Sequence, residues 1–119
     1  MQFTILHNPR CSKSRKTLEI LRSHGVEPGI VRYLDTPPSA DELVAIAERL
    51  GQPLADLLRR GETVFKRATD LPPLDDTAAL AAWMSANPIT LERPIVLRDD
   101  GAARVGRPPE SVLELIKHG

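Results

Sequence analysis

The single cysteine of the chain, Cys11, is the residue best placed to do chemistry. It follows a short apolar segment and the dipeptide Asn8-Pro9, and it stands just before the apolar repeat of a predicted helix. The first N–H groups of a helix lack partners within the helix and the helix dipole is positive there, so this position stabilises a thiolate and could also cradle an oxyanion. Arg10, Lys13 and Arg15 add positive charge nearby. We therefore expect Cys11 to be a nucleophile with a pKa below the ordinary thiol value of about 8.5.

The competing interpretation of Cys11 is a buried residue that packs as a small apolar side chain. Its strand–turn–helix position favours the reactive interpretation. A lone cysteine excludes an intramolecular disulfide, and Ser14 stands where the thioredoxin-like redox motif has its second cysteine, so any redox cycle needs an external thiol. The residue six positions after Cys11 is Thr17 rather than arginine, which argues against a tyrosine-phosphatase loop.

Arginine usage is the second chemical signal, with twelve arginines against four lysines. Proline follows Arg93 and Arg107, which biases both backbones toward extended geometry, and a planar guanidinium suits a tetrahedral oxyanion. The alternative is a set of solvent-facing arginines that reflects a GC-rich genome. Arg59-Arg60 closes a predicted apolar helix, where stabilisation of the carboxyl-end dipole competes with ligand binding as an explanation.

The elements that must position these residues begin with a predicted βαβ unit. Residues 2–7 read as a strand, a helix runs from Ser12 or Ser14 to a glycine stop at Gly25, and residues 30–34 form a second, parallel strand. His7 ends the first strand close to Cys11, where it either hydrogen-bonds the loop or plays a purely structural part.

The middle of the chain is predicted to be a helical insertion, at about residues 39–88, within one domain of residues 1–119. Its helices span residues 39–50, with a capping box of Ser39 and Glu42, then residues 53–61 and residues 76–86. The sequence pattern predicts neither a helix nor a strand for residues 62–75. Trp83 and Met84 are expected in the core. A β-hairpin at residues 95–98 and 102–105 and a helix opened by Pro108 and Pro109 complete an α/β fold.

Composition excludes several classes of function. The formal net charge is zero and there are four aromatic residues, which argues against a nucleic-acid or anionic-membrane binder. Three scattered histidines and one cysteine give no zinc-type cluster, so we expect no metal. No 18 apolar residues run together and the N-terminus lacks a signal-peptide pattern, so we expect a cytoplasmic protein.

Three motifs together resemble the glutaredoxin-coupled arsenate reductase family, over nearly the whole chain. They are residues 7–15 (HNPRCSKSR), 92–96 (ERPIV) and 106–110 (GRPPE). The resemblance is closest to the short, arsenate-reductase-like branch, because the chain ends soon after its last predicted helix. It implies a thioredoxin-like mixed sheet with flanking helices and the helical insertion described above. A related branch that regulates RNA polymerase keeps two cysteines, which this sequence lacks.

The resemblance also implies roles for particular residues. Cys11 would be the nucleophile, and Arg59, Arg93 and Arg107 would hold the oxyanion, with Arg60 competing for the place of Arg59. His7 and Ser14 would tune the thiolate, and Pro94 would be the cis-proline beside the active cysteine.

The activity implied is reduction of arsenate to arsenite through a Cys11 adduct, with glutathione as co-substrate, glutaredoxin as partner and no tightly bound cofactor. A monomer is expected. Two alternatives stay open: a non-catalytic thioredoxin-like module that binds a protein or senses oxidants, and a glutathione-dependent reductase of another substrate.

Overall fold

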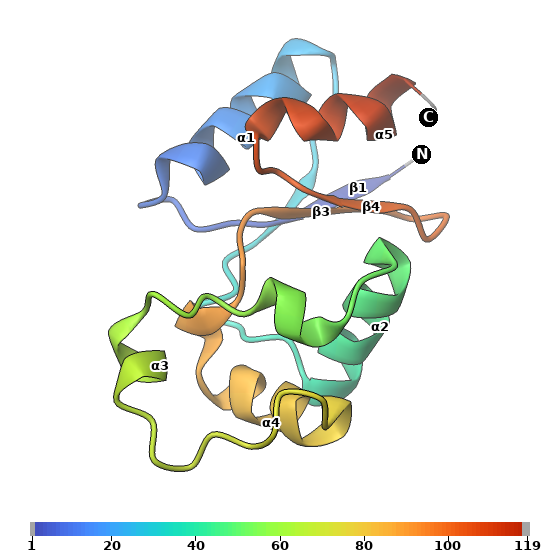
Figure 1. Cartoon of the computed structure of the whole chain (residues 1–119). Coiled ribbons are helices and arrows are strands. Elements are labelled where there is room, and N and C mark those ends of the chain that lie inside the picture. The colour runs from blue at the N-terminus through green and yellow to red at the C-terminus, as the bar shows by residue number, and fades with distance from the viewer. Residues whose placement is uncertain (1, 118–119) are drawn as a thin grey trace. The chain divides into compact units, whose positions relative to one another are not determined.

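A computed structural model describes residues 2–117 and separates them into two units (Figure 1). One, the sheet unit, combines Met1–Tyr33 with Arg93–Gly119, and the other, the helical unit, is Leu34–Glu92. The helical unit contains the insertion that the sequence placed at about residues 39–88. The third histidine, His118, lies outside the described residues.

The sheet unit is built on a mixed sheet of order β2-β1-β3-β4. Strand β1 (Phe3–Leu6) pairs in parallel with β2 (Gly29–Val31) and antiparallel with β3 (Ile95–Arg98), and β3 forms a hairpin with β4 (Ala103–Val105). The parallel βαβ unit and the hairpin are confirmed. Strand β2 ends at Val31, whereas the sequence predicted that it continues to Leu34. Its partner β1 ends at Leu6, and the last backbone hydrogen bond between the two segments runs from the His7 N–H to the Val31 carbonyl.

Helix α1 (Ser12–Ser23) and the C-terminal pair, a 3₁₀ turn η3 (Pro109–Val112) and helix α5 (Leu113–Lys117), cover one face of this sheet (Figure 1). Helix α1 ends at a left-handed Gly25, as the glycine stop predicted. Aliphatic side chains and one phenylalanine form the core between these helices and the sheet: Phe3, Ile5, Leu18, Leu21, Val96, Val112 and Leu115. This packing holds α1 against the sheet through Leu18 and Leu21.

The helical unit is organised around α2 (Ala40–Leu50) and α4 (Thr77–Ala86), which pack together. The capping box of Ser39 and Glu42 is present, and Gly51 ends α2 in the left-handed conformation. Asp76 caps α4 through the Ala79 N–H. Trp83 and Met84 are buried, as expected. Residues 62–75, which had no assignment, contain one helical turn, α3 (Thr63–Lys66).

The predicted helix at residues 53–61 is wrong in length. A 3₁₀ turn, η1 (Leu54–Leu57), is followed by extended backbone at Leu58, which pairs with Leu91 after a second short turn, η2 (Pro88–Thr90). The Arg59 N–H donates to the Thr90 carbonyl at 2.7 Å. Pairing between segments distant in sequence thus ends the helix early. Arg59 and Arg60 therefore do not lie in the last turn of a helix, where they would stabilise its dipole.

We predict that Ser39→Ala destabilises the protein by about 0.5–2 kcal/mol, because the Glu42 N–H loses its side-chain acceptor. Urea denaturation followed by circular dichroism measures the change. Ser39→Thr, which keeps a hydroxyl at the cap, is the control and should lie close to the unsubstituted protein. Equal stability of the alanine and threonine variants would contradict the assignment of this cap.

Candidate active site

The turn between β1 and α1 places Cys11 at the N-cap of α1, with extended backbone and a half-exposed side chain. The Cys11 N–H donates to the Asn8 carbonyl at 3.0 Å, and the Asn8 side chain accepts from the Arg10 N–H at 3.0 Å. Asn8 therefore stabilises the turn through the backbone N–H groups of both Arg10 and Cys11. The sequence predicted a turn that begins at Asn8-Pro9, and asparagine is common in such turns, but Asn8 was not among the predicted site residues.

The Cys11 thiol has a lowered pKa, although its partial burial acts in the opposite direction. Hydrogen bonds from the Ser14 N–H, the Arg93 side chain and the Lys13 N–H lower the pKa, and the positive charge of Arg93 adds to them. The expected lowering is thus present, and the helix N–H groups contribute as predicted. The side-chain cation that lowers the Cys11 pKa is Arg93, which is distant in the sequence. The sequence analysis had assigned this effect to the neighbouring Arg10, Lys13 and Arg15.

A second guanidinium reaches the same sulfur. Arg107 Nη2 lies 3.9 Å from Cys11 Sγ, and Arg107 Nε donates to the Arg93 carbonyl at 2.8 Å. Arg93 is 9% exposed and Arg107 is half-buried. The peptide bonds Arg93–Pro94 and Arg107–Pro108 are both cis, whereas the resemblance implied this geometry for Pro94 alone. The Gly106 N–H donates to the Pro94 carbonyl at 2.9 Å, which ties the two Arg-Pro segments together.

His7 and Ser14 form a buried pair beneath the turn. His7 Nδ1 and Ser14 Oγ are 2.7 Å apart, and Ser14 Oγ accepts from the Asn8 N–H at 3.1 Å. Burial lowers the pKa of His7, as do nearby arginines, and both effects favour the neutral ring. His7 therefore contacts the turn through Ser14, whose N–H in turn acts on the sulfur.

Arg59 belongs to the helical unit and is held there by two carboxylates. Its Nε lies 3.1 Å from Glu62 Oε1 and its Nη1 lies 3.0 Å from Glu92 Oε1, and all three side chains are about one-quarter exposed. Arg60 is exposed. The sequence indicated neither glutamate as a partner, because the contact between Arg59 and Glu92 depends on the pairing of Leu58 with Leu91.

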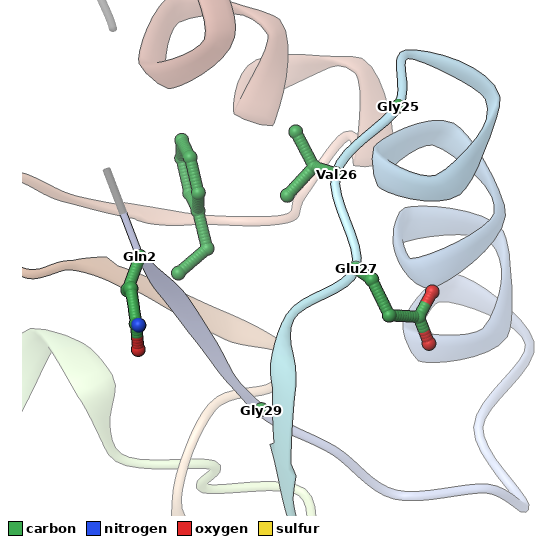
Figure 2. Close-up of a pocket in the computed structure, with 6 residues that line it drawn as sticks. Gln2, Gly25, Val26, Glu27 and Gly29 are labelled. Carbon is green, nitrogen blue, oxygen red and sulfur yellow. The ribbon is translucent and has the colours of Figure 1, made fainter.

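The opposite end of α1 carries a pocket of about 330 Å³ between the starts of β1 and β2 (Figure 2). Its lining includes Gln2, Phe3 and Val26, while the Glu27 carboxylate turns toward α1 and pairs with Arg22 at 2.9 Å. Within residues 2–117, no three His, Cys, Asp or Glu side chains cluster as metal ligands. No helix in the described part is long and apolar enough to cross a membrane.

The fold and site together define a class of protein: an α/β protein whose one thiolate, at a helix N-terminus, is flanked by two guanidinium groups. This donor set matches a tetrahedral oxyanion that reacts with sulfur.

Comparison with known proteins agrees with this class, because the model of the ArsC family matches residues 6–115. The chain belongs to the ArsC family. It is 46% identical to the Escherichia coli K12 protein YfgD, described as uncharacterized, with 97% of each chain covered. It is 44% identical to an arsenate reductase of Neisseria meningitidis serogroup A, with 93% of this chain and 95% of the relative covered.

Among solved structures, the arsenate reductase of Vibrio cholerae superposes with a TM-score of 0.84 at 43% identity, covering 96% of this chain and 97% of that one. The thioredoxin-like α/β fold is thereby confirmed.

We predict that Arg93→Gln raises the Cys11 pKa, because the thiolate loses a cationic hydrogen-bond donor. The rate of iodoacetamide alkylation as a function of pH measures the pKa, and its midpoint should shift to higher pH. Arg104→Gln, an exposed position on β4, removes the same charge elsewhere in the sheet unit and should leave the midpoint in place. An unshifted midpoint in Arg93→Gln would show that Arg93 does not stabilise the thiolate.

Proposed function

We propose that the protein is an arsenate reductase that uses Cys11 as its nucleophile. The observation that carries the proposal is the approach of Arg107 Nη2 to within 3.9 Å of Cys11 Sγ, beside the buried Arg93 that also donates to the sulfur. Relatives in Neisseria meningitidis and Vibrio cholerae that carry the name arsenate reductase support arsenate as the oxyanion.

In the first step the Cys11 thiolate attacks arsenic. A sulfur–arsenic bond forms, an arsenic–oxygen bond breaks, and the departing oxygen takes up protons and leaves as water. Arg93 and Arg107 neutralise the oxyanion and hold it beside the sulfur, and Arg59 is a third candidate ligand. The helix N–H groups that stabilise the thiolate lower the Cys11 pKa and so raise its deprotonated fraction near neutral pH, where arsenate is anionic.

The reducing electrons must come from outside, because Cys11 is the chain's single cysteine. The glutathione thiol then attacks the arsenic of the adduct: a second sulfur–arsenic bond forms, another arsenic–oxygen bond breaks, and that oxygen takes up protons and leaves as water. The thiolate of a glutaredoxin then attacks the glutathione sulfur, so that a disulfide forms and the electron pair of the broken sulfur–arsenic bond reduces As(V) to As(III). Water releases arsenite and the Cys11 thiolate, and a second glutathione restores the glutaredoxin. No tightly bound cofactor takes part, and the reaction suits a monomer in the cytoplasm.

We predict that Cys11→Ser abolishes arsenate-dependent NADPH oxidation in an assay with glutathione, glutathione reductase and glutaredoxin, because serine cannot form the adduct. Circular dichroism should show an unchanged fold. Activity of the serine variant at the level of the unsubstituted protein would refute the mechanism. An inactive unsubstituted protein that nonetheless reduces a glutathione mixed disulfide through Cys11 would move the substrate from arsenate to disulfides.

Glu92→Gln should lower the KM for arsenate by about three- to tenfold with little change in kcat. An anion that binds Arg59 competes with the carboxylate held 3.0 Å from Nη1, and glutamine keeps the shape but removes the charge. Glu48→Gln, on the exposed face of α2, is the control and should leave KM unchanged. An unchanged or raised KM in Glu92→Gln would argue against an exchange of carboxylate for substrate at Arg59.

A further inference from the structure

Four exposed cations surround the Cys11 turn: Arg10, Lys13, Arg15 and Lys16. No acidic residue occurs among residues 7–18, although the chain as a whole has a formal net charge of zero. Within the described residues, none of these four side chains forms an ion pair, and the Arg15 side chain donates instead to the Pro9 carbonyl at 2.9 Å. We call these four residues the basic collar.

The cations that contact the reacting sulfur lie outside the basic collar and are Arg93 and Arg107. The cation that lowers the Cys11 pKa, against the opposing effect of burial, is Arg93, and Lys13 contributes only its backbone N–H. Lys13, Arg15 and Lys16 alternate along α1 with the buried Ser14 and Thr17, and their side chains therefore leave the helix in different directions. The charge of the collar is spread over a surface rather than focused on a point.

A hollow of about 670 Å³ adjoins the basic collar. Its mainly apolar lining begins at His7 and Pro9 and continues along α1 to Ser23. The charged side chains that line it are Arg15, Glu19 and Arg22, of which Arg22 is paired with Glu27. An apolar hollow with a charged rim has the composition of a protein-docking surface, where a partner's side chain fills the centre and polar groups surround it.

We propose that the basic collar and this hollow form the docking surface for a thiol-carrying reductant protein whose own surface is acidic around its reactive thiol. The inference rests on the proposed function, because it concerns the partner that regenerates Cys11. The collar increases the rate of encounter through charge complementarity, and the hollow takes up an apolar side chain of the partner. A glutathione molecule alone is too small to contact cations that lie on several sides of the turn.

The test uses the full chain with Cys11 converted to its glutathione mixed disulfide and an Escherichia coli glutaredoxin as the reductant, with no arsenate present. The glutaredoxin thiolate attacks the glutathione sulfur, a new disulfide forms, and the bond to Cys11 breaks with its electron pair left on the Cys11 sulfur. The second-order rate constant is measured over a range of salt concentrations. Because arsenate is absent, this test can succeed even if the proposed arsenate chemistry fails.

The collar variant combines Arg10→Gln, Lys13→Gln and Lys16→Gln. The matched control combines Arg49→Gln, Lys66→Gln and Arg104→Gln, at exposed positions on α2, α3 and β4. We expect the collar variant to react about tenfold more slowly than the unsubstituted protein at low salt. The two should converge as salt screens the charges. The control variant should react at the unsubstituted rate, and free glutathione should react equally with all three proteins.

An unchanged glutaredoxin rate in the collar variant would overturn the proposal. An equally large loss of rate in the control variant would also overturn it, because the net charge of the protein would then explain the effect. An equal loss with free glutathione would assign the collar to the small anion instead. Ser23→Tyr fills the hollow without a change of charge, and we expect it to lower the glutaredoxin rate at every salt concentration. An unchanged rate in that variant would remove the hollow from the docking surface.

Discussion

The register between β1 and β3 is the constraint on which the site depends. Leu6, the last residue of β1, pairs with Ile95, the first residue of β3, and Ile95 pairs in turn with Val105 of β4. The carboxyl end of β1, the amino end of β3 and the carboxyl end of β4 therefore lie side by side. Cys11 follows the first of these ends, Arg93 precedes the second, and Arg107 follows the third. A shift of one residue would turn the buried side chains of β3 to the other face, so the core that fixes the helices also fixes the site.

The positive charges near Cys11 divide into two groups by burial. Arg93 is enclosed and acts on the sulfur, where a low dielectric strengthens each interaction and no solvent has to reorganise. The exposed cations of the turn are screened by water and ions, so their effect on the thiolate is small and their effect on approaching molecules is larger. Proximity in sequence is therefore a poor guide to which cation tunes a thiol.

Sequence reasoning succeeded where local chemistry decides the outcome. The capping box at Ser39, the glycine stop at Gly25 and the thiol at the start of α1 all depend on residues within a few positions of one another. It failed at residues 53–61, where a helical apolar pattern was overridden by the pairing of Leu58 with Leu91. The same pairing brings Glu92 to Arg59, which no spacing in the sequence could indicate. The placement of Arg93 and Arg107 beside Cys11 was available only through the family resemblance.

The sheet unit is assembled from the two ends of the chain, and Cys11, His7, Ser14, Arg93 and Arg107 all belong to it. The helical unit is one continuous segment, Leu34–Glu92, with its own core and caps. In evolutionary terms, the reactive thiol and the intervening segment can diverge at different rates. Replacement or elaboration of residues 34–92 leaves these reactive groups in place, so the reactivity of the sulfur can be inherited while the helical unit changes.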